Sequence, residues 1–202
     1  MKFIIATKNQ KKKLELERIL SPMGFEVLCE ADLDSPLPEV EETGETFEDN
    51  ALLKARSACE ATGLAAIADD SGLCVDALEG APGVYSARYG EPGWNDGQRT
   101  EHLLHNLEGV AAPQRTARFV SAVCCVLPDG RSLTLRGECE GSIAFAPQGV
   151  NGFGYDPVFL VGEKTFSQMD DAQKDGVSHR GKALRLLRER LPSFLQGNVE
   201  AR

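Results

Sequence analysis

The chain has 202 residues, of which 42% are hydrophobic and 26% charged, enough for one large domain or two closely joined lobes with a sizeable core. It carries 31 acidic and 22 basic residues, a net charge of −9. That balance disfavours nucleic acid and anionic membranes as partners, because binding to either depends on positive patches. No apolar run reaches the roughly 20 residues of a membrane span, and residues 1–6 are too few for the apolar part of a signal peptide. We therefore expect a cytoplasmic protein with no nucleic acid and no membrane partner.

The cysteine pattern agrees with that compartment. None of the six cysteines belongs to a C-x-x-C pair, and most of them lie in apolar stretches. We interpret them as reduced thiols of the core, as is usual in the cytosol.

The chain begins with a short apolar segment, residues 3–6, which is followed by a polar loop and a periodic apolar run over residues 14–20. This pattern predicts a strand, a loop and a helix with Asn9 as its N-cap. Three lysines lie at the positive end of that helix dipole, where cations are normally unfavourable. A solvated lysine-rich turn is the ordinary alternative, but the junction favours an anion site. The lysines are Lys8, Lys11 and Lys12.

An acidic loop precedes the second predicted helix. Three glutamates, among them Glu42, crowd together in this loop, which by itself is typical of a solvated face. Residues 46–49, Thr-Phe-Glu-Asp, match a capping box, and apolar residues follow at helical spacing as far as Gly63. Asn50 and Lys54 lie one turn apart on the other face of this helix, and both can point back toward the acidic loop.

The segment Ala65–Leu73 joins an apolar run to two adjacent acids, a hydroxyl and a glycine. We expect a strand over residues 65–68, a turn at Asp69, Asp70 and Ser71, and a further strand over residues 73–75. Asp, Ser and Gly are ordinary turn residues. A plain turn needs only one Asp, however, so these residues alone leave a turn and a functional site as equal alternatives.

The middle of the chain contains a long loop, a predicted helix and the remaining predicted strands. A long Gly- and Pro-rich loop over residues 80–93 is more typical of a functional segment than of a plain connection. His102 and His105, on a predicted helix over residues 95–107, are possible metal ligands, although a solvated helical face is the commoner explanation of their spacing. Later apolar runs indicate two or three antiparallel strands and, with the preceding units, a mixed sheet surrounded by helices. These runs cover residues 116–127, 132–140 and 143–145.

Two dense stretches occupy the last third. Residues 149–157 form a glycine-rich loop with two aromatic side chains, either of which can stack on a base. Further on, Ser178 is a candidate N-cap, which places His179 and Arg180 at the positive end of the last helix. Because cations occupy the unfavourable end of a helix for a second time, an anionic ligand explains the pattern better than two unrelated surface turns.

Three groups therefore stand out: cations at two helix starts, carboxylates at a loop and a strand, and an aromatic loop. Carboxylate oxygens bind Mg²⁺, which bridges phosphate oxygens, while Lys and Arg neutralise the remaining charge. The combination fits a nucleoside phosphate held with a divalent metal. The chain has neither a P-loop nor a G-x-G-x-x-G motif, which excludes the standard NTPase and dinucleotide sites. A nucleotide sensor without hydrolysis is the alternative, but its clustered acids would repel the ligand.

Six separated motifs follow one another over nearly the whole chain. They are Thr7-x-Asn9-x-x-Lys12, Glu42-Thr-Gly-x-Thr46-Phe47 with Asn50 and Lys54, Ala68-Asp69-Asp70-Ser71-Gly72-Leu73, Gly83-Val-Tyr-Ser86-Ala87-Arg88, Phe153-Gly-Tyr-Asp156-Pro157 and Ser178-His179-Arg180-Gly181. Together they resemble the inosine/xanthosine triphosphate pyrophosphatase family. Lys8 departs from the pattern, because such proteins often carry a smaller residue between the Thr and the Asn.

The resemblance implies one domain over residues 1–202, with an elongated mixed α/β fold, two lobes around a central cleft, and a homodimer. It also implies hydrolysis of dITP, ITP and XTP to the nucleoside monophosphate and pyrophosphate, a reaction that cleanses the nucleotide pool. A related pyrophosphatase for modified pyrimidine nucleotides is the nearest alternative.

The same resemblance implies roles for individual residues. Asp70 is expected to be the catalytic base and, with Glu42, a ligand of Mg²⁺. The segment 7–12 is expected to hold the phosphates, and residues 153–156 to frame the base and sugar. The implied substrate-binding set is Thr7, Lys8, Asn9, Gln10, Lys11, Lys12, Ser71, Phe153, Gly154, Tyr155, Asp156, Lys174, His179 and Arg180.

The implied chemistry is attack of water on the α-phosphorus, with Mg²⁺ and the lysines stabilising charge on the leaving pyrophosphate. We expect the like charge of Asp69 to raise the proton affinity of Asp70 until metal binds. A purine with a carbonyl at its 6-position accepts a hydrogen bond where adenine donates one, so a buried His or Lys donor can distinguish them. Guanine shares that carbonyl, and the sequence identifies no residue that rejects its 2-amino group.

Overall fold

The computed structural model describes residues 1–7 and 9–197, without the side chains of Lys11 and Ile19. The chain divides into two compact units. Unit 1 comprises Met1–Asp70, Ser121–Gly137 and Lys182–Arg202, and unit 2 comprises Ser71–Val120 and Glu138–Gly181. The expectations of a single domain and of a cleft between two lobes stay predictions.

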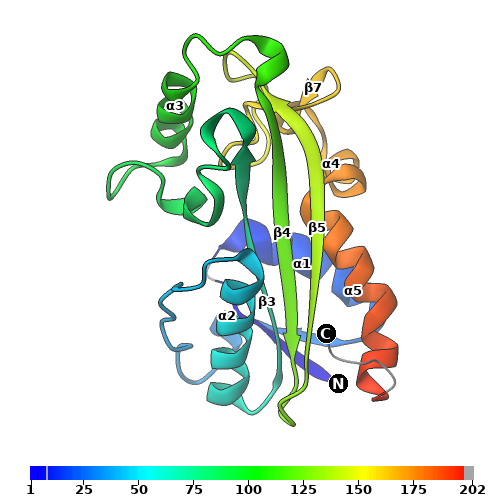
Figure 1. Ribbon diagram of the computed structural model, residues 1–202. Helices are drawn as coiled ribbons and strands as arrows, with labels where there is room; N and C mark the ends of the chain where they lie inside the picture. The colour runs from blue at the N-terminus through cyan, green and yellow to red at the C-terminus, as the bar shows by residue number, and fades with distance from the viewer. Residues whose placement is uncertain (8, 198–202) are drawn as a thin grey trace. The chain divides into compact units, whose positions relative to one another are not determined.

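Seven strands form one sheet in the order β2-β1-β3-β4-β5-β6-β7, and β4 and β5 are its long neighbouring strands (Figure 1). Strand β1 is parallel to both β2 and β3, whereas β6 is antiparallel to both β5 and β7. The sheet is therefore mixed and flanked by helices, as the sequence predicts. The strands are β1 Lys2–Ile5, β2 Glu26–Leu28, β3 Ala65–Val75, β4 Thr116–Val126, β5 Ser132–Ile143, β6 Phe159–Val161 and β7 Lys164–Thr165.

The helices begin and end at the residues that local chemistry indicates. Asn9 Oδ1 accepts a hydrogen bond from Lys12 N at 3.2 Å, and Thr46 Oγ1 accepts one from Asp49 N at 3.1 Å, which satisfies free donors of the first turns. Gly63 ends the second helix at a positive φ of 66°, which glycine adopts without a steric penalty. The α-helices are α1 Gln10–Leu20, α2 Phe47–Thr62, α3 Asp96–Asn106, α4 Asp171–Val177 and α5 His179–Leu195. Short 3-10 turns cover Ser21–Met23, Glu30–Asp32, Asp76–Leu78, Gly83–Arg88, Ala112–Gln114 and Phe166–Gln168.

The expected turn at Asp69–Ser71 is wrong, because β3 continues without interruption from Ala65 to Val75. Apolar side chains on both sides of the acidic pair, such as Ile67 and Leu73, are fully buried. Burial along the whole strand outweighs the turn preference of Asp-Ser-Gly. Since successive strand side chains point to opposite faces, Asp69 and Asp70 project from opposite faces of the sheet. Of the two or three strands expected over residues 116–145, the structure has two, β4 and β5.

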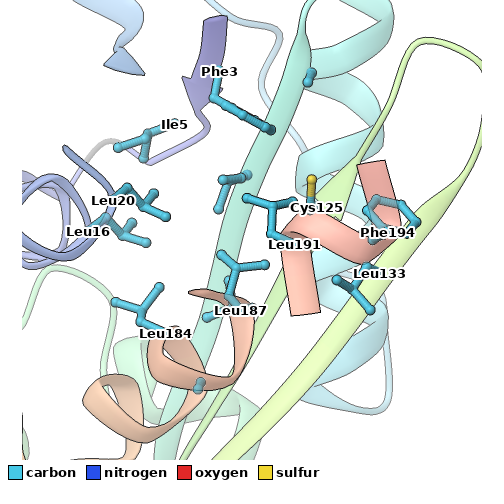
Figure 2. Packing of buried hydrophobic residues seen from close by; sticks show 14 of the residues in the cluster. Phe3, Ile5, Leu16, Leu20, Cys125, Leu133, Leu184, Leu187, Leu191 and Phe194 are labelled. Carbon is cyan, nitrogen blue, oxygen red and sulfur yellow. The ribbon is translucent and has the colours of Figure 1, made fainter. Parts of the chain in front are cut away.

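Each unit has its own hydrophobic core. In unit 1, buried side chains of β1, α1 and α5 point toward one another, as Figure 2 shows for Phe3, Leu16 and Leu187. In unit 2, three phenylalanine rings pack together among leucines and valines. All six cysteines are free thiols, and five of them are buried. Among residues 1–7 and 9–197, no helix combines the length and the apolar character needed to cross a membrane.

Candidate active site

The loop between β1 and α1 is ordered by its own side chains. Thr7 Oγ1 accepts a hydrogen bond from Asn9 N at 3.2 Å, and Asn9 in turn caps α1 through Lys12 N. Gln10 is exposed in the first turn of α1. Lys8 and the Lys11 side chain lie outside the described residues. The part of this loop that is described has the strand, cap and helix start that the sequence predicts for an anion site.

Lys12 is held by a buried carboxylate. Its Nζ lies 3.1 Å from Oδ2 of Asp69, whose side chain has no exposed surface, while 16% of the Lys12 side chain stays exposed. A buried partner restricts a flexible lysine to one region. The lysine side chain then loses less conformational entropy when a ligand binds. Asp69 therefore places the Lys12 ammonium on the α1 side of β3.

On the other face of β3, one lysine joins two carboxylates. Lys54 Nζ, from α2, lies 2.9 Å from Asp70 Oδ1 and 2.7 Å from Glu42 Oε1. The sequence predicts that Lys54 points back toward the acidic loop, and this is confirmed. The loop, the helix and the strand thus bring two oxygen donors and one ammonium group together within unit 1.

Asn50 ties the acidic loop to the same cluster. It is fully buried, and its Oδ1 accepts a hydrogen bond from Gly44 N at 2.8 Å. Its Nδ2 lies 3.4 Å from both the Gly44 carbonyl and Asp70 Oδ2. A Cβ at Gly44 would lie 2.7 Å from Asn50 Oδ1, so only glycine allows the loop to approach α2 this closely. Asn50 therefore fixes the loop that carries Glu42.

Burial raises the pKa of Asp70 above the ordinary range of an aspartate, although Lys54 and Lys12 attract its ionised form. The neighbouring like charge of Glu42 also raises this pKa. The direction agrees with the sequence-based expectation, but the principal cause is burial rather than repulsion by Asp69. For Lys54, burial disfavours the charge, yet the acids Asp70, Asp69 and Glu42 outweigh it and raise the lysine pKa.

The donor set around Lys54 fits a small hard cation. Mg²⁺ is usually held by one or two carboxylates together with substrate phosphates and water, and Asp70 and Glu42 supply two carboxylates. Within the described part of the chain, no group of three or more His, Cys, Asp or Glu side chains could hold a metal ion. A metal held by Asp70 and Glu42 would therefore take its other ligands from substrate and water. His105 instead contacts Glu108 at 2.9 Å, and His102 contacts Asn106 at 3.2 Å.

In unit 2, two cations surround the ring of Phe153. Lys174 Nζ lies 4.8 Å and Arg180 Cζ 5.8 Å from the centre of this ring, which is only partly buried. Both distances suit cation–π attraction. Arg180 Nη2 also donates a hydrogen bond to Ser71 Oγ at 2.9 Å. Two predicted cations, Lys174 and Arg180, therefore lie at one aromatic ring, and Ser71, distant in the sequence, contacts Arg180.

The second aromatic residue of the loop has a different position. Tyr155 is only 4% exposed, and its hydroxyl donates a hydrogen bond to the Ser86 carbonyl at 3.0 Å. Burial raises the pKa of this hydroxyl. Gly154, between the two aromatics, donates its N–H to Asp96 Oδ2 at 2.8 Å. Of the two rings in residues 153–156, Phe153 thus has the more accessible face.

His179 opens α5 inside an aromatic stack. Its ring lies parallel to Phe119 at a centroid distance of 4.7 Å and to Phe166 at 6.3 Å. The preceding residue, Ser178, caps the helix by accepting a hydrogen bond from Gly181 N at 3.0 Å. A Cβ at Gly181 would meet the Asp175 carbonyl, so the glycine lets α5 start directly against α4.

Several contributing residues carried no functional signal in the sequence. Phe119 and Phe166 look like ordinary core residues, and only the fold brings them to His179. Asp96 reads as the first residue of a helix, yet it holds Gly154. Ser86 lies in one of the recognised motifs, where its contacts with Tyr155 and with Leu73 N were not evident.

The chain matches the model of the Ham1 family over residues 3–190. It is 52% identical to a dITP/XTP pyrophosphatase of Exiguobacterium sp. over 200 residues, which cover 98% of this chain and 100% of that protein. A dITP/XTP pyrophosphatase of Haemophilus influenzae is 48% identical over 194 residues, covering 94% and 98%. A solved HAM1 protein from Coxiella burnetii superposes with a TM-score of 0.87 at 37% identity, covering 96% of this chain and 99% of that one. From its sequence, its fold and these relatives, the chain belongs to the Ham1 family.

Proposed function

We propose that the protein hydrolyses the non-standard purine nucleoside triphosphates dITP, ITP and XTP to the nucleoside monophosphate and pyrophosphate. The observation that carries the proposal is the cluster of Lys54, Asp70 and Glu42, in which two acids and a lysine meet on one face of β3. Acids beside phosphate-binding lysines suit metal-dependent hydrolysis better than simple binding. Two relatives that are 52% and 48% identical to this chain bear the name dITP/XTP pyrophosphatase.

The residues of unit 1 act on the triphosphate. Backbone N–H groups at the start of α1, the Thr7 and Asn9 side chains and the cationic side chains of this loop, Lys12 among them, hold the phosphates. Lys8, Gln10 and Lys11 complete that segment. Asp70 accepts the proton of the attacking water and aligns that water with the α-phosphorus, a positioning role that supplies much of the rate in phosphoryl transfer.

Asp70 and Glu42 also hold Mg²⁺ when the substrate binds. The bound ion supplies charge stabilisation for the phosphate oxygens and the leaving pyrophosphate. Lys54, already in contact with both carboxylates, keeps them together before the ion arrives and limits their mutual repulsion.

The residues of unit 2 recognise the base and the sugar. Phe153 provides the stacking face, and Gly154, Tyr155 and Asp156 complete that loop. Lys174, His179 and Arg180 supply the donors, and Ser71 orients Arg180.

A carbonyl at the purine 6-position matches these donors, whereas the amino group of adenine would leave a buried donor unpaired. A site built for a hydrogen bond rejects the wrong partner strongly, because the unpaired group loses its solvation. We therefore expect hypoxanthine and xanthine nucleotides to be preferred over adenine nucleotides.

A substrate panel tests the function. Purified protein with Mg²⁺ is given dITP, ITP, XTP, dATP, dGTP and modified pyrimidine triphosphates, and the products are identified. We expect pyrophosphate and monophosphate from the first three at rates far above those of dATP and dGTP. Release of single orthophosphates, lack of base selectivity or a preference for the pyrimidines would contradict the proposal.

We also propose, from the family resemblance, that the protein is a cytoplasmic homodimer. Its free cysteines suit a reducing compartment. Light scattering of the purified protein at several concentrations tests the assembly, and a mass of one chain throughout would exclude the dimer.

A further inference from the structure

Helix α3 holds the two peptide groups on either side of Gly154. Asp96 Oδ2 accepts a hydrogen bond from Gly154 N at 2.8 Å, and Thr100 Oγ1 donates one to the Gly154 carbonyl at 3.4 Å. Asp96 and Thr100 are four residues apart, so they are neighbours on the same side of the helix. One side of α3 therefore binds both backbone groups of a glycine that lies 58 residues after Asp96 in the chain.

We propose that Asp96 and Thr100 are positioning residues for nucleotide binding: by fixing the backbone of Gly154, they set the direction of the Phe153 ring. The inference rests on the proposed function and deepens it, because it identifies the side chains that prepare the stacking face. Both residues act through the backbone of Gly154 rather than through contact with the nucleotide.

The conformation of Gly154 explains why this backbone needs external support. Its φ of 59° lies in the left-handed region, and a glycine has more backbone freedom to lose than any other residue. The next residue, Tyr155, is anchored by the hydrogen bond from its hydroxyl to the Ser86 carbonyl at 3.0 Å. With Tyr155 fixed and both peptide groups of Gly154 held, the preceding residue, Phe153, is left with one direction of approach. A loop that is ordered before the ligand arrives loses less entropy on binding.

Helix α3 is a firm support for these contacts. Thr100 is 3% exposed, and Leu103, three residues later, is completely buried in the core of unit 2. The helix start is closed by a capping box, in which Asn95 and Gln98 exchange two hydrogen bonds of 3.0 Å. Asp96 and Thr100 thus keep their places without help from the loop that they hold.

An acid in the first turn of a helix has an ordinary explanation, attraction to the helix dipole. That explanation accounts for Asp96 alone but not for its partner. The carboxylate lies 3.6 Å from Arg99 Nη1 of its own helix, yet its shorter contact is with Gly154 N. Thr100, one turn further on, binds the other backbone group of the same glycine. Two contacts that converge on one residue favour the positioning role.

The first test compares two substitutions of Asp96 by pyrophosphate release from dITP. The Asp96 side chain is 59% exposed, so neither variant leaves a buried charge. Asp96→Ala removes the acceptor of Gly154 N, and we expect KM to rise about fivefold, as for the loss of one hydrogen bond. The value of kcat should change less than about twofold, since binding and not chemistry is affected. Asp96→Asn keeps an oxygen acceptor and should restore KM to within about twofold of the unmodified protein. An equal rise in both variants would mean that the charge itself acts on the nucleotide, which would overturn the proposal.

The second contact has its own pair of variants. Thr100→Val removes the hydroxyl but keeps the shape of the side chain, and we expect KM to rise about threefold because this bond is longer. Thr100→Ser keeps the hydroxyl and should leave KM unchanged. The same rise in KM with serine as with valine would show that packing of the side chain is responsible, and the role assigned to its hydroxyl would fall.

Gln98→Ala is the matched control. It breaks the capping box at the start of α3 but leaves both contacts with Gly154 in place. The thermal midpoint should fall while KM stays the same. If KM rises as much as in Asp96→Ala, a general loosening of α3 explains the effect and the proposal is wrong.

A second measurement needs neither substrate nor catalysis. Backbone hydrogen exchange followed by NMR should show the Gly154 amide exchanging at least about tenfold more slowly than in an unstructured peptide, and losing this protection in Asp96→Ala. An unprotected Gly154 amide in the unmodified protein would contradict the proposal. Protection of this amide in a protein that does not hydrolyse dITP would instead overturn the proposed function, so the two failures are distinct.

Discussion

Asp69 and Asp70 follow one another in β3, yet their carboxylates bind lysines from different helices. Asp69 Oδ2 lies 3.1 Å from Lys12 Nζ of α1, and Asp70 Oδ1 lies 2.9 Å from Lys54 Nζ of α2. The alternation of side chains along a strand directs the two acids to opposite faces, so each binds a different lysine. One acid positions a cation at the phosphate loop, and the other belongs to the carboxylate cluster.

Asp70→Asn should abolish turnover without unfolding the protein. Loss of a general base costs about 10²–10⁴-fold in rate. The free energy of unfolding should change by less than about 1 kcal/mol, because Lys54 keeps Glu42 as a charged partner at 2.7 Å and is not left as an uncompensated buried charge. Pyrophosphate release and urea denaturation measure the two effects. A collapse of stability would identify Asp70 as a structural residue.

Asp69→Asn is the neighbouring control. It leaves Lys12 without its charged partner on the opposite face of β3, so we expect kcat/KM for dITP to fall about tenfold, equivalent to about 1.4 kcal/mol. The Mg²⁺ concentration for half-maximal activity should stay the same, because Asp70 and Glu42 remain. A changed Mg²⁺ requirement in Asp69→Asn would contradict the separation of the two acids.

Protons and Mg²⁺ should compete for Asp70. Burial raises the pKa of this carboxyl in the metal-free protein, and only the ionised form acts as base or ligand, so activity falls as the pH falls through that pKa. Metal binds the ionised form, so more Mg²⁺ should move the acidic limb of kcat/KM to lower pH, by up to about one pH unit per tenfold in Mg²⁺. Rate profiles at two Mg²⁺ concentrations measure the shift. An acidic limb that stays fixed would contradict a role for Asp70 in metal binding.

The sequence predicts most elements of unit 1 because local chemistry determines them. Asn9 and Thr46 cap their helices through hydrogen bonds that need only neighbouring residues. The approach of Lys54 to the acidic loop follows from helical spacing, since Lys54 lies on the face of α2 opposite the apolar one. Family membership and the mixed sheet are likewise confirmed by the comparisons and by the strand order.

Tertiary packing determines the features that the sequence does not predict. Asp-Ser-Gly has the composition of a turn, but burial of the whole of β3 keeps it extended. The sequence does not distinguish Phe153 from Tyr155, because both are aromatic residues of the same loop. Only the fold shows that the tyrosine points inward and donates a hydrogen bond to Ser86. The stack of His179 on Phe119 joins residues 60 positions apart in the numbering, which no local pattern reveals.

Phe153 and Tyr155 should therefore respond differently to substitution. Phe153→Leu removes the stacking face. We expect it to weaken the binding of dITP by about 1–3 kcal/mol, measured as a higher KM, with little change in the thermal midpoint. Tyr155→Phe removes a buried hydrogen bond to Ser86 and should lower the free energy of unfolding by about 1 kcal/mol, with a smaller effect on KM. Steady-state kinetics and thermal melts of both variants make the comparison. The opposite assignment of effects would show that Tyr155 is the stacking residue.

Gly44→Ala should weaken metal binding through the loop that carries Glu42. The new Cβ would lie 2.6 Å from Asp49 Cβ and 2.7 Å from Asn50 Oδ1, so the loop must move away from the start of α2. Glu42, two residues earlier, then loses its place beside Lys54 and Asp70, and we expect the Mg²⁺ concentration for half-maximal activity to rise about tenfold, which corresponds to about 1.4 kcal/mol. Gly176→Ala is the matched control, since its Cβ meets no atom within 4 Å. Titration of activity with Mg²⁺ measures both variants, and an unchanged requirement in Gly44→Ala would mean that Glu42 does not hold the metal.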